Sequence, residues 1–508
     1  ALIDDQMLLD TDQTGSDFDR VPKTPPTTER LENSTLLSEM RPFMTWLVEN
    51  GFLYSVHWEI TWRCNEKCIH CYNPGAAHFD DEKHSRDTDE LSLEQVKSAL
   101  VDLKKIGVAK ITFSGGDPFV RKDMFQILEA ARSMGFVVDV YTNALLLKPK
   151  AMDKLLSLYP SCVGVSVYSS NADAHDAITK VPGSFDKSVK ALKRLNQAGV
   201  RTAMKAIQMQ QTVHGWHDTQ KLAHDLGAGA EIDFGLTAGA DGAQAPLDHA
   251  ITDFKQLIIV ALSPDSPLYV GSEEKGFNAI VRDPTHSVCG AGISSIGIDP
   301  EGSVVPCLSL PLVSGSLKTE TILDIWRARH HRHSNKNATS TRPSPRNEVE
   351  VTELANPDSV LARWSQITLT DYRECGTHDR CIWCQRCPGM SMSETGNPLN
   401  PSTSNCRNAA ARMLAASLSL SGVTRSKACD LFNLSEEFGS QADEYILPAS
   451  SHRDGNSCTQ FDPRKTGLEA IGCGSCGDNC HSSSELDLSN LITSTERRGL
   501  EAMAEANR

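Results

Sequence analysis

Short apolar runs alternate with amphipathic stretches along the first half of the chain, from Ser55 to about Leu236. Short apolar runs predict buried strands, and apolar positions three and four residues apart predict helices. The predicted strands span residues 56–61, 111–114, 137–142, 163–168, 202–208 and 231–235. The predicted helices span residues 92–105, 123–134, 149–158, 185–198 and 216–226.

This alternation of strand and helix predicts a parallel sheet with helices on its outer face. Six repeats fit an α/β fold built as a partial (β/α)6 barrel that resembles a TIM barrel. Active sites of such barrels lie at the carboxyl ends of the strands. Polar residues and cysteines at those ends are therefore the first site candidates.

The pattern changes after about Pro264. Residues 289–307 alternate apolar and polar positions around the turn Asp299-Pro300-Glu301-Gly302, which predicts a β-hairpin. Residues 328–365 are expected to form an inserted linker, and the basic run 327–333 favours a solvated loop over a site for a metal or an acidic partner. We expect a polar N-terminal segment (1–50), the barrel (51–265), a small cysteine-rich α+β domain (266–410) and a C-terminal extension (411–508).

Composition excludes several classes of protein. The chain has 508 residues, of which 39% are hydrophobic, and no apolar stretch is long enough to predict a transmembrane helix. Residues 1–30 are polar and acidic without the layout of a signal peptide, so we expect a disordered tail on a cytoplasmic protein. The net charge of −15 argues against non-specific nucleic-acid binding, because phosphate-binding surfaces are usually basic.

The sixteen cysteines give the strongest chemical signal. Most of them lie two to six residues apart, a spacing that favours metal clusters over a disulfide framework. Cys162, in an apolar run, is the exception and is expected in the core.

Three cysteines, Cys64, Cys68 and Cys71, follow directly after the first predicted strand. Thiolates are soft ligands suited to iron–sulfur clusters, and a [4Fe–4S] cluster needs four ligands. Three cysteines would leave the fourth iron open to a small molecule, and open metal positions are typical of catalysis. The alternative is a zinc loop in which His70 supplies the fourth ligand, although the spacing favours the cluster.

This Cys-x3-Cys-x2-Cys loop resembles the hallmark of the radical S-adenosylmethionine (SAM) superfamily. Gly115-Gly116-Asp117-Pro118 is similar to the family's Gly-Gly-Glu-Pro motif, which holds the methionine amino group of SAM. Thr142-Asn143 resembles the family's Thr-Asn-Gly motif, here with Ala144, and Ser166 matches a position that contacts SAM. His70 stands where the family usually has an aromatic residue, and Asp117 replaces its Glu.

The resemblance implies an enzyme whose reduced cluster cleaves SAM. The resulting 5′-deoxyadenosyl radical would abstract hydrogen from a substrate, and an electron donor such as flavodoxin or ferredoxin would be needed. No general acid or base stands out among Asp233, Asp241, Lys205 and Tyr168, each of which is expected to be a surface or packing residue.

The later cysteines resemble a SPASM domain, which appends two auxiliary iron–sulfur clusters to radical SAM enzymes. By resemblance, auxiliary cluster I would be held by Cys289, Cys307 and Cys387. Auxiliary cluster II would be held by Cys375, Cys381, Cys384 and Cys406, although His378 can replace Cys381 in a second alignment. Zinc ribbons at the same positions are the alternative.

The family's commonest SPASM-bearing members modify a ribosomally made peptide or protein, so a peptide maturase is the leading interpretation. Residues 1–54 are too short for a leader-binding domain, so leader recognition is expected to need a separate leader-binding partner or the C-terminal tail. The alternatives are an enzyme acting on a small molecule or a haem precursor, and a non-catalytic electron-transfer protein. The motif Cys473-x2-Cys476-x3-Cys480 fits a further cluster, zinc, a redox pair, a fused substrate-like peptide or free thiols, and the roles of Cys429 and Cys458 stay open.

Overall fold

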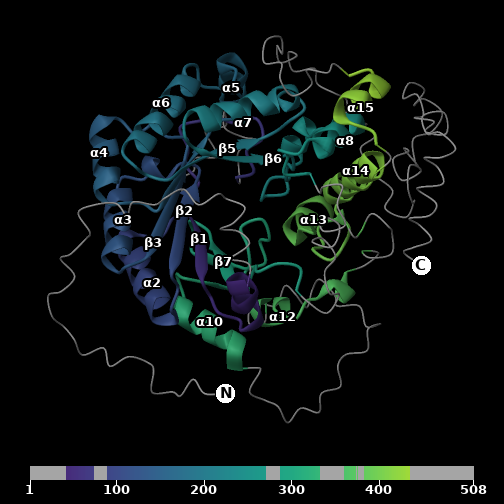
Figure 1. Cartoon of the computed structure of the whole chain (residues 1–508). Coiled ribbons are helices and arrows are strands. Elements are labelled where there is room, and N and C mark those ends of the chain that lie inside the picture. Colours follow the sequence, from purple (N-terminus) through teal and green to yellow (C-terminus); the bar gives the residue numbers. More distant parts are fainter. Residues whose placement is uncertain are drawn as a thin grey trace.

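A single curved sheet organises the computed structural model of the chain (Figure 1). The structure describes residues 42–73, 89–269, 287–331, 360–372, 375, 381, 383–420 and 422–434. Within these ranges nine strands form one sheet in the order β6-β5-β4-β3-β2-β1-β7-β8-β9. The strands are β1 (Ser55–Thr61), β2 (Lys110–Gly115), β3 (Val137–Thr142), β4 (Cys162–Ser166), β5 (Thr202–Ile207), β6 (Gly229–Asp233), β7 (Ser295–Ile298), β8 (Ser303–Val305) and β9 (Gly315–Ser316).

Strands β1 to β6 run parallel to their neighbours, and the helices between them cover the outer face of the sheet (Figure 1). These helices are α2 (Leu93–Ile106), α3 (Met124–Ser133), α4 (Pro149–Ser157), α5 (Ala172–Thr179), α6 (Ser184–Gln197) and α7 (Trp216–Asp225). The predicted partial barrel is therefore confirmed. The structure ends β4 at Ser166 rather than residue 168, and it places β6 two residues earlier than predicted.

Local sequence signals explain where these helices begin and end. Ser92 caps α2: its side chain accepts a hydrogen bond from the backbone of Gln95, whose side chain accepts one from the backbone of Ser92. This capping box satisfies backbone donors that a helix start leaves unpaired. The helix stops at Gly107, whose φ of +97° lies in the left-handed region that glycine adopts easily.

Alternation along the strands separates an apolar outer face from a polar inner face. Val56, Trp58 and Ile60 of β1 belong to the main hydrophobic core against the helices. Successive side chains of a strand point to opposite faces, so His57 and Glu59 point into the barrel.

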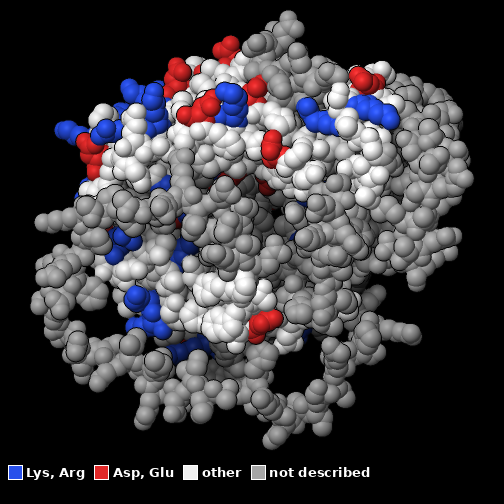
Figure 2. Space-filling model, viewed as in Figure 1, with Lys and Arg blue, Asp and Glu red and all other residues white. Residues whose placement is uncertain are grey.

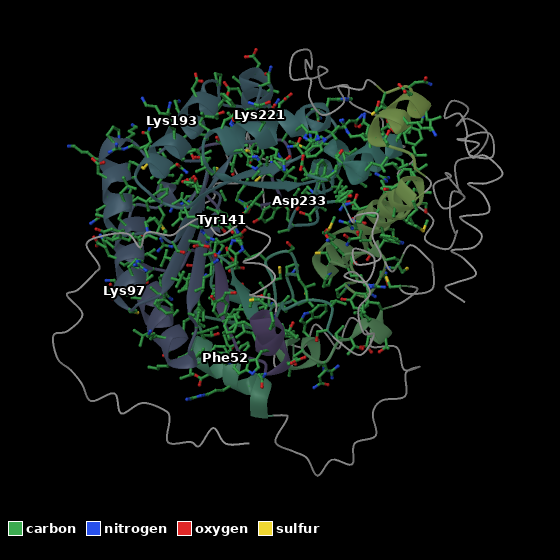
Figure 3. The ribbon with its side chains drawn as sticks, in the orientation of Figure 1. Phe52, Lys97, Tyr141, Lys193, Lys221 and Asp233 are labelled. Carbon is green, nitrogen blue, oxygen red and sulfur yellow. The ribbon has the colours of Figure 1, made fainter. Side chains whose placement is uncertain are left out.

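Figure 3 shows Tyr141 and Asp233 on this inner side, whereas Lys97, Lys193 and Lys221 lie on the surrounding helices. The barrel interior is thus lined by polar groups instead of the branched apolar side chains that fill a closed barrel.

The predicted hairpin at 289–307 is confirmed as β7 and β8, which pair antiparallel around residues 299–302. Its place in the fold was not predicted. β7 pairs parallel with β1, so the hairpin extends the barrel sheet beyond its first strand.

The later helices are α8 (Phe254–Leu262), α10 (Ile322–His331), α12 (Val360–Trp364), α13 (Pro388–Thr395), α14 (Thr403–Leu420) and α15 (Arg425–Phe432). Ile258 of α8 and Ala411 and Ala415 of α14 share a second hydrophobic core. Within the residues predicted as the linker 328–365, α10 extends to His331 and residues 360–364 form α12 with buried apolar side chains. Helix α14 also crosses the boundary predicted at residue 410.

The described part of one face of the molecule has a mixed charge. Figure 2 shows Lys and Arg intermingled with Asp and Glu over the helices that cover the sheet. Among the residues described, no helix has both the length and the apolar character that crossing a membrane requires.

Candidate active site

The loop that carries Cys64, Cys68 and Cys71 leaves the carboxyl end of β1 and is anchored on two sides. Toward β2, the backbone N–H of Gly116 donates to the carbonyl of Thr61 at 2.8 Å, and that of Asp117 donates to Arg63 at 2.9 Å. Toward α5, the N–H groups of Lys67 and Ile69 donate to the carbonyls of Thr179 and Ile178, each at 3.0 Å. The cysteines are therefore held on a fixed backbone at the mouth of the barrel.

Gly115 and Gly116 are the reason that the loop can lie so close to β2. A Cβ on Gly115 would stand 2.0 Å from the carbonyl oxygen of Thr61, and one on Gly116 would stand 2.3 Å from that of Arg63. The resemblance assigned the motif that contains these two glycines to SAM binding. Their contacts show that they admit the backbone of the cysteine loop.

Asp117 ties the end of β2 to the end of β3. Its Oδ1 accepts from the N–H of Phe119 at 2.9 Å, and its Oδ2 accepts from the Thr142 hydroxyl at 2.5 Å and from the N–H of Asn143 at 2.9 Å. Burial raises the pKa of Asp117, and these three hydrogen bonds oppose that rise by stabilising the carboxylate. Three residues predicted to bind SAM thus meet in one buried network.

Asn143 extends this network to the cysteines. Its side-chain amide donates to Oδ1 of Asn65 at 2.9 Å and to Sγ of Cys64 at 3.7 Å. The next residue, Ala144, has a φ of +65°, in the region that favours glycine. This conformation explains why the motif that Thr142-Asn143 resembles ends in glycine.

The cysteine thiols lie in a shielded environment. Burial raises the pKa of Cys64 to about 12 and raises that of Cys68 as well, so both thiols are protonated when no metal is bound. Sγ of Cys68 lies 3.5 Å from Oε2 of Glu66, whose pKa burial raises to about 8, and 4.0 Å from the hydroxyl of Tyr168. The second carboxylate oxygen of Glu66 is buried without a hydrogen-bond partner.

The donor set fits a [4Fe–4S] cluster. Coordination by a metal deprotonates a thiol outright, which offsets the burial that keeps these thiols neutral. In the described part of the chain, no three His, Cys, Asp or Glu side chains converge as the ligands of a single metal ion would. The cysteines of a cluster do not need to converge, because each one binds a different iron.

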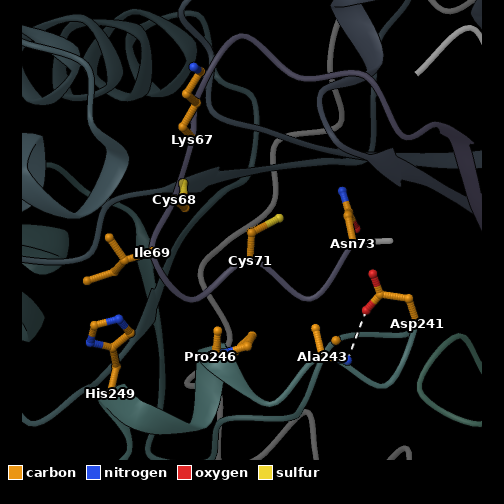
Figure 4. A pocket seen from close by; sticks show the side chains of 11 residues that line it. Lys67, Cys68, Ile69, Cys71, Asn73, Asp241, Ala243, Pro246 and His249 are labelled. Carbon is orange, nitrogen blue, oxygen red and sulfur yellow. Dashed lines mark hydrogen bonds between the residues drawn. The ribbon is translucent and has the colours of Figure 1, made fainter. Parts of the chain in front are cut away.

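A cavity of about 260 Å³ opens beside the loop (Figure 4). Cys68, Cys71 and Asn73 line it from the loop, and Asp241 and His249 line it from the segment after β6. That segment is fixed to the loop, because the N–H of Ala240 donates to the carbonyl of Tyr72 at 2.8 Å.

His70 takes the packing role of the aromatic residue that it replaces. Its ring contacts Tyr168 edge to face, with centroids 4.5 Å apart, and Tyr168 in turn stacks on His175. Burial lowers the pKa of His70 to about 3, so the ring is neutral. Tyr168, expected to be a packing or surface residue, packs beside Cys68, and Ser166 forms a hydrogen bond with its hydroxyl.

The sequence did not single out the pair Glu59 and Tyr72. The Tyr72 hydroxyl donates to Oε1 of Glu59 at 2.5 Å, and Nε1 of Trp62 donates to Oε2 at 3.2 Å. Burial raises the pKa of Glu59. The signal in the sequence that could have found Glu59 is the alternation of polar and apolar positions along β1.

The cysteines of the 289–406 region lie near one another, and Cys375 is close to members of both predicted ligand sets. Cys307 lies near Cys387, and Tyr372 lies among Cys289, Cys375 and Cys387. Cys384 lies near Cys375 and Cys381, and its Sγ is 3.9 Å from the carbonyl of Asn405, next to Cys406. His378, Cys458, Cys473, Cys476 and Cys480 lie outside the described residues.

Two further cysteines are buried, one in the barrel and one in the C-terminal helices. Cys162 is 6% exposed on β4, as expected of a core residue. Cys429 lies in α15 within the second hydrophobic core.

Family models match two segments of the chain, one that carries Cys64, Cys68 and Cys71 and one that carries Cys289 and Cys307. Residues 58–223 match the sequence model of the radical SAM superfamily, and residues 289–347 match that of SPASM, an iron–sulfur cluster-binding domain. An AdoMet-dependent heme synthase of Methanosarcina barkeri is 24% identical over 53% of this chain and 81% of its own length.

Two further relatives are named for the maturation of mycofactocin and for the biosynthesis of the bacteriocin subtilosin. Mycofactocin maturase MftC of Mycolicibacterium smegmatis is 28% identical over 49% of this chain and 63% of its own length. The antilisterial bacteriocin subtilosin biosynthesis protein AlbA of Bacillus subtilis is 29% identical over 52% of this chain and 57% of its own length. The chain is therefore a radical SAM enzyme with a C-terminal SPASM domain, and its cofactors are SAM, a SAM-binding [4Fe–4S] cluster and auxiliary iron–sulfur clusters.

Proposed function

We propose that the enzyme modifies a ribosomally made peptide or protein through hydrogen abstraction. Cys64, Cys68 and Cys71 hold the cluster that, when bound, supplies the electron for cleaving SAM. The residues that border SAM are Gly115, Gly116, Asp117, Thr142, Asn143 and Ser166. Asp117 keeps the ends of β2 and β3 together, and Asn143 orients Cys64 through its side-chain amide.

The polar lining of the barrel is the observation that carries the choice of a peptide. Nε2 of His57 lies 2.7 Å from the hydroxyl of Ser114, and Nζ of Lys205 lies 4.1 Å from the centre of the Tyr141 ring. Lys205 also forms an ion pair with Glu231. Such a wall offers hydrogen-bond partners to a peptide backbone, whereas a porphyrin ring needs apolar walls to bury its faces.

Helix α13 adds support, because it brings the SPASM region to the mouth of the barrel. A Cβ on Gly235, just after β6, would lie 3.4 Å from the terminal methyl of Met390 in α13, which begins directly after Cys387. An auxiliary cluster held by Cys289, Cys307 and Cys387 would therefore lie near a substrate in the barrel. A second would be held by Cys375, Cys381, Cys384 and Cys406.

A haem precursor is the second candidate substrate. The extent of the alignment favours it, since the chain matches 81% of the Methanosarcina heme synthase but 63% and 57% of the two peptide-related proteins. In either case an electron donor such as flavodoxin or ferredoxin would reduce the catalytic cluster. A peptide substrate would also call for a leader-binding partner.

The two candidates separate in one experiment on the anaerobically reconstituted full chain. Precursor peptides encoded near its gene and iron-coproporphyrin are each added with SAM and reductant. We expect one of the peptides to accelerate the formation of 5′-deoxyadenosine and to change in mass. With the variant in which Cys64, Cys68 and Cys71 are replaced by Ala, we expect neither effect. Consumption of iron-coproporphyrin with every peptide unchanged would overturn the proposal in favour of the haem precursor.

A further inference from the structure

Arg412 is an arginine buried inside α14, with 4% of its surface exposed. Its Nη1 donates to the carbonyl of Trp383 at 3.3 Å, and its Nη2 donates to Oε1 of Gln385 at 3.2 Å. The third nitrogen of the guanidinium, Nε, is buried without a hydrogen-bond partner. The two acceptors are neutral, and they belong to the residues on either side of Cys384.

The face of α14 that carries Arg412 lies against Cys384. Ala409 and Ala416 form one hydrophobic cluster with Trp383 and Cys384. They are three residues before and four residues after Arg412, so all three side chains share one face of the helix. The carbonyl of Asn405, which lies 3.9 Å from Sγ of Cys384, is two turns earlier on the same side.

A buried guanidinium with only neutral acceptors is costly, because it loses its hydration without gaining a counter-charge. Burial lowers the pKa of Arg412, while Cys384 in its thiolate form and, to a smaller extent, Asp233 at the end of β6 raise it. Because Arg412 donates to the residues on both sides of Cys384, the thiolate that metal coordination produces at Cys384 supplies a counter-charge next to the guanidinium.

We propose that Arg412 is the counter-charge of the auxiliary cluster ligated by Cys384 and that it raises the reduction potential of that cluster. A four-cysteine cluster carries a net negative charge that grows on reduction, and cluster potentials follow the charges and hydrogen bonds around the sulfurs. A cation beside Cys384 therefore stabilises the reduced state more than the oxidised state. The inference rests on the ligand set proposed above for auxiliary cluster II and not on the choice of substrate.

The test is a redox titration of the anaerobically reconstituted full chain, followed by electron paramagnetic resonance. Cys384→Ala first identifies the signal of this cluster by removing it. For Arg412→Met we expect the midpoint potential of that signal to fall by about 59 mV, which is a tenfold change for a one-electron couple. Arg412→Lys keeps the charge and restores most of the potential.

Arg425→Met in α15 is the matched control, because it removes the same charge from a neighbouring helix and leaves the potential unchanged. Iron content and melting temperature establish that each variant is folded and loaded, and Arg412→Gln removes the same charge if Arg412→Met does not fold. An unchanged potential in Arg412→Met, or an equal fall in Arg412→Lys, would overturn the proposal. A Cys384→Ala variant that keeps every cluster signal would also overturn the proposal about Arg412. The proposed modification of a peptide would not be affected by that result, because it is tested separately by SAM cleavage with a peptide.

Discussion

Gly116 packs so tightly against Arg63 that a Cβ on the glycine would stand 2.3 Å from the arginine carbonyl oxygen. The end of β2 and the cysteine loop therefore form one unit, which the hydrogen bond from Asp117 to the same carbonyl closes at 2.9 Å. A side chain at this point must displace the loop that carries the cysteines.

We expect Gly116→Ala to reduce the iron bound at the catalytic cluster and to slow SAM cleavage in proportion, because the loop backbone has to shift. Iron and sulfide counting after reconstitution measures the loss. Gly229→Ala in β6 is the control, since a Cβ there meets nothing closer than 3.7 Å. Full cluster content in Gly116→Ala would show that the loop is adaptable.

Ala144 is strained by its φ of +65°. A left-handed conformation costs a residue with a Cβ roughly 1–2 kcal/mol, and a glycine at the same position avoids this cost. Part of the stability gained is lost, because glycine gives the unfolded chain more conformational freedom. We expect Ala144→Gly to stabilise the protein by about 0.5 kcal/mol in urea unfolding. Ala177→Gly, inside α5, should instead destabilise it by about 1 kcal/mol. A loss of stability in both variants would contradict the strain at Ala144.

The three loop cysteines and the SPASM cysteines should be separable. Replacing Cys64, Cys68 and Cys71 together with Ala should abolish the formation of 5′-deoxyadenosine and leave roughly eight irons in two auxiliary clusters. Iron analysis and chromatography of the reaction products give both readings. Retained SAM cleavage would refute the assignment of the loop, and stoichiometric zinc in place of iron would support ribbons.

The lowered pKa of the buried His57 leads us to expect a loss of stability in mild acid. Burial, with smaller contributions from Lys205 and Lys110, lowers its pKa to about 4 from an ordinary value of 6.5. The unfolded chain therefore takes up a proton at higher pH than the folded chain, so the stability present above pH 6.5 falls as the pH drops toward 4. Urea unfolding from pH 7.5 to 4.5 should show His57→Gln losing less stability over this range than the unchanged protein, by on the order of 2 kcal/mol. Equal losses in the two proteins would mean that other groups carry the acid sensitivity.

Local patterns were sufficient for much of this protein. The six barrel strands follow from the spacing of apolar positions, and Ser92 and Gly107 mark the ends of α2 through hydrogen bonds made within a few residues. The cysteine loop was recognisable for the same reason, since Cys64, Cys68 and Cys71 lie within one short segment. Several helices were not predicted, among them α5, α10, α13 and α15. Two others, α8 and α12, were missed because α8 is apolar at most of its positions and α12 is a single short turn.

Tertiary structure decided what these segments do to one another. The sequence does not show that β7 pairs with β1, that Gly116 lies against Arg63, or that both Asp117 oxygens are used within the protein. It also does not show that Cys384 packs on the face of α14 that carries Arg412. Each of these contacts joins residues that are distant along the chain, where no periodicity or fixed spacing links them. Their partners are chosen by packing and by the pairing of buried polar groups, so they are determined only when the whole chain has folded.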